Sequence, residues 1–170
     1  MDVRTGRRYD PAPMAAEPIV AKERWNLERT LFGPDEIRKC NAQRFEMEHL
    51  DAVTLLDAAA QEVVGYKDVH ADEFWVRGHI PGRPLLPGVI MIEALAQLTS
   101  FYVGRAVPDI GFIGFGAVDG VKFRGMVVPG QRLVLVGKAV SIRSRMAVFD
   151  SQGWVDDKLV VEARITGMKI

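Results

Sequence analysis

The run from Val89 to Val103, VIMIEALAQLTSFYV, is almost wholly apolar. Its apolar residues fall on every face of a helix, which predicts a buried helix that Gly104 would cap at its C-terminal end. Glu93 is the one charged residue in this run, and Gln97 follows it by one helical turn. A carboxylate inside a buried helix is costly unless it is paired or used. The pattern therefore indicates an acid/base site at Glu93.

The remaining pattern predicts strands more than helices. Segment 53–69 favours two strands, or one strand with a break, while a helix over 55–64 stays open as an alternative. The run Phe74-Trp75-Val76, with two aromatic residues, predicts a short strand. After the helix, segments rich in Val, Ile and Phe alternate with turn residues. These four expected strands are 111–123, 131–140, 146–155 and 159–168, and the last two are expected to form a hairpin.

The order of these elements predicts one domain with an α+β fold, in which a curved antiparallel sheet wraps around the central helix. Residues 34–170 form this domain, beginning with a helix of about ten residues from Pro34 towards Gln43. Residues 1–33 are expected to be an extension, either disordered or a docking arm. Four apolar side chains are available for docking: Trp25, Leu27, Leu31 and Phe32.

Composition narrows the function classes. The 170 residues carry 22 basic and 22 acidic side chains, so the zero net charge gives no support to a nucleic-acid partner. Cys40 is the only cysteine, which excludes an internal disulfide and gives no zinc-ligand spacing. No apolar run is long enough to span a bilayer, and no signal-peptide core is present. We expect a cytoplasmic protein without a metal site or a membrane span.

The chain then shows a family resemblance. Residues 78–97, GHIPGRPLLPGVIMIEALAQ, closely resemble the signature of the hotdog-fold 3-hydroxyacyl-acyl carrier protein dehydratases of type II fatty acid synthesis. The spacing of 14 residues between His79 and Glu93 matches that family. The run GFGAVDGVKFRGMVVPGQRL at 114–133 is similar to the central strand of the family and its following turn. The resemblance extends from about Arg44 to Ile170.

The resemblance implies a mechanism without metal or redox cofactor. His79 would be the general base that removes the α-proton of a 3-hydroxyacyl thioester. Glu93 would protonate the departing hydroxyl, with Gln97 holding it in place. The backbone N–H of Gly88 would stabilise the enolate oxygen from the helix N-terminus.

The resemblance also implies partners. In this family the histidine and the acid of one site come from different subunits, so we expect a homodimer, which can assemble further into a hexamer built as a trimer of dimers. The acyl chain would ride on acyl carrier protein or coenzyme A. Candidate walls of the acyl tunnel are Phe74, Trp75, Phe112 and Phe115. Candidate contacts for an acidic carrier are Arg83, Lys122, Arg124 and Arg132.

Departures from the family pattern leave the pathway open. The family usually begins a His-Arg-aromatic-Pro run where this chain has Gln43, Arg44, Phe45 and Glu46. The usual phenylalanine after the catalytic histidine is Ile80. The acyl chain length, the carrier, and a role in bulk fatty acid synthesis or in a specialised lipid or polyketide pathway therefore stay undecided.

Two other functions remain as alternatives. One is a hotdog acyl-thioester hydrolase, in which the helical carboxylate activates water and His79 has no role. The other is a non-catalytic acyl-binding or assembly protein. His49 and His70 are interpreted as surface or strand-edge residues, Cys40 as an ordinary thiol and Trp154 as a packing residue.

Overall fold

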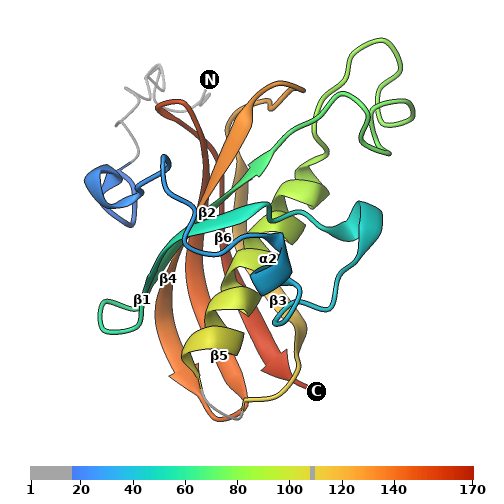
Figure 1. The fold of residues 1–170 in the computed structure, drawn as a ribbon. Coiled ribbons are helices and arrows are strands. Elements are labelled where there is room, and N and C mark those ends of the chain that lie inside the picture. Colours follow the sequence, from blue (N-terminus) through green and yellow to red (C-terminus); the bar gives the residue numbers. More distant parts are fainter. Residues whose placement is uncertain (1–16, 108–109) are drawn as a thin grey trace, which may run out of the picture.

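The computed structural model describes residues 17–107 and 110–170. A six-stranded antiparallel sheet curves around the long helix α2 (Gly88–Ala106), as Figure 1 shows. The strand order across the sheet is β1-β2-β4-β5-β6-β3. The strands are β1 (Ala52–Asp57), β2 (Glu62–Asp68), β3 (Ile113–Phe123), β4 (Arg132–Arg143), β5 (Met146–Val155) and β6 (Lys158–Lys169). The expected α+β fold, with its sheet wrapped around the central helix, is confirmed.

Alternate residues of a strand point to opposite faces of the sheet. Over β2 and β4, both of these faces are apolar. Val63 and Leu133 are fully buried in the core that contains α2. Their neighbours Val64 and Val134 belong to a second apolar cluster. One face of these strands therefore packs against the helix, and the other needs a different cover.

Residues 19–27, with the short 3₁₀ helix η1 (Lys22–Arg24), supply that cover (Figure 1). Trp25 is buried, and its ring centre lies 5.9 Å from that of Trp154 on β5. The Trp25 indole N–H donates to the carbonyl of Val20 at 2.8 Å, so its polar atom is satisfied. Arg24 forms ion pairs with Asp57 and Glu62 beside the cluster. The interpretation of Trp154 as a packing residue is confirmed.

The segment before the long helix forms two strands, so the helical alternative for residues 55–64 is wrong. β1 pairs with β2 in antiparallel register, with Val53 opposite Gly65. The hairpin predicted for the last two strands is also confirmed, since β5 pairs with β6.

Three local predictions are wrong because specific side-chain contacts override the local sequence pattern. Helix α1 is only Pro34–Ile37, since the chain then turns and the guanidinium of Arg44 donates to the backbone carbonyl of Arg38 at 3.0 Å. A second 3₁₀ helix, η2 (Phe45–Met47), follows this turn. The run 74–76 is a turn instead of a strand, and in this turn the buried Trp75 indole donates to the Glu73 carboxylate at 2.8 Å. Gly104 does not cap α2.

The helix α2 continues past Gly104 and ends at Ala106. Gly104 instead allows another part of the chain to pack closely against the helix. A Cβ atom at Gly104 would lie 3.2 Å from the Cβ of Cys40. The absence of a side chain thus allows the turn that carries Cys40 to approach the helix closely. None of the helices within residues 17–107 and 110–170 is long and apolar enough to cross a membrane.

Strand β3 ends the sheet and pairs, within the described part of the chain, with β6 alone. Its residues are mostly exposed, including the large apolar side chains of Phe115, Val118 and Phe123. A long, apolar edge strand offers unpaired backbone groups to another chain. Strand β3 is therefore an exposed and largely apolar edge of the sheet.

Candidate active site

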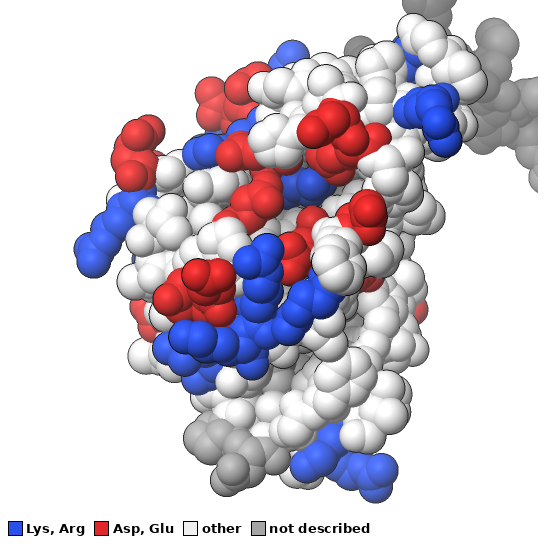
Figure 2. Space-filling model, turned by 45° about the vertical axis from the view of Figure 1, so that its right-hand side comes forward, with Lys and Arg blue, Asp and Glu red and all other residues white. Residues whose placement is uncertain are grey.

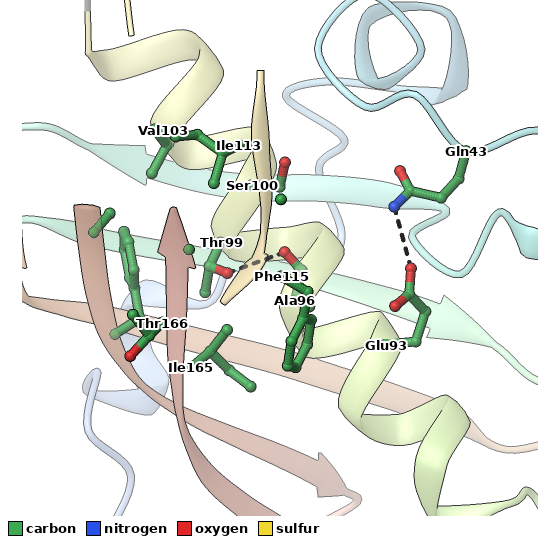
Figure 3. Close-up of a pocket in the computed structure, with 14 residues that line it drawn as sticks. Gln43, Glu93, Ala96, Thr99, Ser100, Val103, Ile113, Phe115, Ile165 and Thr166 are labelled. Carbon is green, nitrogen blue, oxygen red and sulfur yellow. Dashed lines mark hydrogen bonds between the residues drawn. The ribbon is translucent and has the colours of Figure 1, made fainter. Parts of the chain in front are cut away.

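Glu93 lies on the second turn of α2, and two carboxamides hold it. The Nε2 of Gln97 donates to Glu93 Oε1 at 2.8 Å, and the Nε2 of Gln43 donates to the same oxygen at 3.2 Å, the bond drawn in Figure 3. Gln97 is buried and is itself fixed, because its Oε1 accepts the backbone N–H of His49 at 2.8 Å. One oxygen of the carboxylate is therefore occupied, and Oε2 is the oxygen left for a ligand.

A pocket extends from Glu93 along one face of α2 (Figure 3). The helix contributes Ala96, Ser100 and Val103 to its wall, at the three- and four-residue spacing of a single helical face. From Glu93 to Val103 the helix rises by about 15 Å. The opposite wall comes from the sheet and includes Ile113, Phe115, Phe149 and Ile165. The lining is mixed, because the polar side chains of Thr99, Ser100 and Thr166 lie beside these apolar ones, and its one acid lies near one end.

His79 lies in the exposed loop that leads from β2 to α2 (Figure 1). Its backbone N–H donates to the carbonyl of Trp75 at 2.9 Å, and its Nδ1 lies 2.9 Å from the carbonyl oxygen of Leu85. Because a carbonyl can only accept, the second contact assigns the ring proton to Nδ1. The lone pair on Nε2 is then available to take a proton.

A second pocket contains His79 and Gly88 together with Phe123 and Met126. The N-terminal end of α2 has no side-chain cap, so the first N–H groups of the helix remain available to an oxyanion. A Cβ atom at Gly88 would lie 2.7 Å from the ring of Phe123, so this glycine also permits a close packing contact. The predicted roles of Gly88, as oxyanion donor and helix-start glycine, did not include this contact with Phe123.

Within one chain, the acid and the base lie in different pockets. Glu93 lines the pocket along α2, whereas His79 and Gly88 line the pocket at the start of the helix, and the two sets of lining residues do not overlap. In a single copy, the predicted acid and the predicted base are therefore not brought into one pocket.

The four aromatic residues expected in a tunnel wall fall in different places. Phe115 lines the pocket that contains Glu93. Phe112 is exposed beside it, at 57 % of its surface, and is not part of the lining. Phe74 lies over a separate surface recess, and Trp75 is buried in the core.

The expected carrier contacts are mostly engaged with acidic neighbours. Arg132 binds Asp68 at 2.6 Å, while Arg124 and Lys122 both pair with Glu162. Arg83 instead contacts the sulfur of Met126 and is exposed on the loop of His79. On the face drawn in Figure 2, acidic and basic side chains are interspersed, in line with the zero net charge.

His49 is buried, so its interpretation as a surface residue is wrong. Its side chain is 1 % exposed, and neither ring nitrogen has a hydrogen-bond partner. The pKa of His49 is lowered to about 4, mainly by burial and also by the positive charge of Lys67, while the charge of Glu73 opposes the shift. The neutral ring is the form that the fold accepts.

This burial predicts how stability depends on pH. The pKa of His49 is lower in the folded chain than in the unfolded chain, so its contribution is present above about pH 6.5 and is lost as pH falls towards about 4. We expect His49→Leu, which removes two unpaired polar atoms, to keep the stability at pH 7 and to flatten its decline by up to about 1.4 kcal/mol per pH unit in this window. Urea unfolding at several pH values measures this, and an unchanged slope would contradict it.

Among the described residues, no three His, Cys, Asp or Glu side chains are grouped in a way that could hold a metal ion.

An antiparallel sheet around one long helix, with a helical carboxylate facing a pocket, defines the hotdog class of acyl-thioester proteins. The family model described as the FabA-like domain matches residues 41–164, and the chain belongs to this family.

The curated relatives carry one activity in their names. A 3-hydroxyacyl-[acyl-carrier-protein] dehydratase FabZ of Clostridium botulinum is 36% identical over 132 residues, which cover 77% of this chain and 91% of the relative. The FabZ of Teredinibacter turnerae is 37% identical over 134 residues, covering 76% and 91%.

Solved structures show the same fold at low identity. The dehydratase heterocomplex ApeI:P from Xenorhabdus doucetiae is similar with a TM-score of 0.67 at 16% identity, covering 79% of this chain and 90% of that one. The PaaI protein of Escherichia coli has a TM-score of 0.54 at 14% identity, covering 68% and 80%. These likenesses concern the fold, and the activity is argued from the site and the family.

Proposed function

We propose that this protein removes water from 3-hydroxyacyl thioesters on acyl carrier protein, giving trans-2-enoyl thioesters for fatty acid or related lipid synthesis, with His79 as base and Glu93 as acid. The dehydratase activity follows from membership of the family. The observation that supports the residue roles is the pair of half-sites. One contains a histidine with a free Nε2, and the other contains a carboxylate with a free Oε2.

Every proton and electron pair moved in the proposed reaction has a donor and an acceptor among the substrate, His79 and Glu93. Nε2 of His79 takes the proton from C2 of the substrate, and the released electron pair forms the double bond to C3. The bond from C3 to the hydroxyl oxygen breaks, and this oxygen takes a proton from Glu93 and leaves as water. While charge develops on the thioester oxygen, the Gly88 N–H at the start of α2 donates to it. A proton passes back from His79 to Glu93 through solvent before the next turnover.

The two half-sites require two copies of the chain. The exposed edge of β3 is the surface that we assign to a homodimer, because Phe115 on this strand also lines the pocket of Glu93. Pairing at this edge would cover the apolar residues of β3 and bring a second copy to the pocket. Further assembly into a hexamer belongs to the same proposal, and we place the enzyme in the cytoplasm, where its single cysteine stays reduced.

The carrier is expected to approach the pocket that contains His79. Arg83 is exposed on the same loop, and its side chain contacts a methionine sulfur instead of a carboxylate. We therefore assign the first contact with an acidic acyl carrier protein to Arg83.

Mixed dimers test the shared site. His79→Ala and Glu93→Gln chains are each expected to be inactive as homodimers, but a heterodimer of the two retains one intact site. After unfolding and refolding of an equal mixture, about a quarter of the parental activity should return. Activity is measured by the loss of enoyl absorbance as crotonoyl thioester is hydrated. A mixture that stays inactive although heterodimers have formed would rule out a site shared between subunits.

An assay of thiol release tests the hydrolase alternative. A hydrolase in which Glu93 activates water would release free thiol from the thioester and would not need His79. We expect no thiol release above the rate without enzyme, and thiol release that persists in His79→Ala would favour the hydrolase.

A further inference from the structure

Gln43 lies at the end of the pocket where Glu93 is found, although it was not among the expected site residues. It comes from the turn before η2, far from α2 in sequence, and its side chain points at Glu93 (Figure 3). Its Nε2 donates to Glu93 Oε1 at 3.2 Å. The contact raises the question of what the other end of this carboxamide does.

The chemistry of Glu93 fixes the orientation of the carboxamide. Glu93 Oε1 accepts hydrogen bonds whether or not a proton sits on Oε2, so the NH₂ end of Gln43 faces this oxygen. The Oε1 of Gln43 is then the remaining end, and it is buried without a hydrogen-bond partner. A buried acceptor without a donor is costly, which makes this oxygen a place where a donor group of a ligand is favoured.

We infer that Gln43 Oε1 accepts a hydrogen bond from the 3-hydroxyl group of the substrate, and from the attacking water in the reverse reaction. This inference rests on the proposed dehydration. A hydroxyl has one hydrogen to donate and two lone pairs. If the hydrogen points to Gln43, a lone pair faces the proton of Glu93, because Gln43 and Glu93 are in direct contact.

Gln43 would therefore orient the leaving group, while Glu93 protonates it. A carboxamide suits this task because it keeps one donor end and one acceptor end at every pH. The donor end holds Glu93, and the acceptor end selects substrates that carry a hydroxyl at C3. The side chain thus links the position of the acid to the recognition of the substrate.

Binding measurements on an inactive background test this assignment. In the His79→Ala protein, we expect 3-hydroxydecanoyl-CoA to bind about tenfold more tightly than decanoyl-CoA, the preference that one hydrogen bond provides. Adding Gln43→Met, which keeps the length of the side chain but removes both polar ends, should abolish this preference. The affinity for decanoyl-CoA should stay within about twofold, since that ligand has no hydroxyl to lose. Calorimetric titration gives both constants.

Ser100→Ala is the matched control, because Ser100 is a polar residue in the wall of the same pocket. It lies on α2, nearly two helical turns after Glu93. This substitution should leave the preference for the hydroxylated ligand intact. A Gln43→Met protein that also keeps the full preference would overturn the inference.

Gln43→His tests whether the effect of residue 43 comes from its hydrogen-bond acceptor or from an effect on folding. A neutral imidazole offers one donor and one acceptor, as the carboxamide does, whereas the protonated ring has no acceptor. Gln43→His should therefore restore the preference for 3-hydroxydecanoyl-CoA well above the ordinary histidine pKa of about 6.5 and lose it well below that value. A preference that does not change with pH in this variant would contradict the inference.

Turnover is measured separately from binding. A failure of the proposed dehydration can therefore be distinguished from a failure of the role of Gln43. Gln43→Met with His79 intact should lower kcat/KM for the 3-hydroxyacyl thioester by about thirtyfold. A parent protein that fails to turn over any 3-hydroxyacyl or enoyl thioester would overturn the proposed dehydration. An active parent whose Gln43→Met variant is equally active would overturn the role of Gln43 alone.

Discussion

Replacing His79 by alanine is expected to lower kcat/KM for hydration of crotonoyl thioester by about a thousandfold, or about 4 kcal/mol of transition-state stabilisation. The reason is that Nδ1 is committed to the carbonyl of Leu85, so Nε2 is the nitrogen free to exchange a proton with the substrate. The fold should survive, because the His79 side chain is exposed and its backbone contact to Trp75 does not depend on the ring. The assay follows enoyl absorbance, and thermal unfolding checks the fold.

His70→Ala is the matched control for this prediction. His70 is an exposed histidine of the same connection between β2 and α2, and its hydrogen bond to Glu73 comes from its backbone N–H. Its removal should leave kcat/KM within about twofold, as expected for a surface substitution that removes no specific contact. Full activity in His79→Ala would show that another group is the base.

The sequence predicts those elements whose burial pattern is local. The helix that carries Glu93 is recognisable because its apolar residues cover every face, and strands β3 to β6 because turn residues separate their apolar runs. The errors occur where one specific contact overrides the pattern, and at Gly104 that contact is distant in sequence. Gly104 looks like a helix end, but it is the surface on which Cys40 packs.

Prediction of the candidate site from the sequence was incomplete for a similar reason. His79, Gly88 and Glu93 could be proposed as site residues because they stand in one motif with a fixed spacing. Gln43 could not, since its contact with Glu93 arises only when the turn before η2 folds against α2. The absence of the family histidine at this position was visible, but its consequence was not. The separation of the two half-sites is likewise a property of the folded chain.

Glu93 and His79 are held in place by different kinds of contact. Glu93 is fixed from within its own chain by Gln43 and Gln97. His79 is held by backbone carbonyls of an exposed loop. We therefore expect a partner subunit to constrain the base more than the acid, so weakening of the dimer should reduce turnover before it unfolds the protein.

Glu93→Gln is expected to reduce turnover as strongly as His79→Ala, by about a thousandfold. A carboxamide at position 93 keeps the size of the side chain and an oxygen that can accept from Gln97 and Gln43, so the hydrogen bonds that hold it can persist. It cannot release a proton to the leaving hydroxyl, which removes the acid without opening a cavity. Stopped-flow hydration of crotonoyl thioester beside thermal unfolding distinguishes lost chemistry from lost structure.

Glu93→Asp provides the complementary case, because it keeps an acid but shortens the side chain by one methylene. The shorter carboxylate is drawn away from the Nε2 atoms of Gln43 and Gln97, which now donate to the longer one. We expect intermediate activity, about a hundredfold below the parent, because a misplaced acid still transfers protons less efficiently than a positioned one. If Glu93→Gln were as active as the parent while Glu93→Asp were impaired, Glu93 would be a packing and hydrogen-bonding residue, and the proton would have to come from another group.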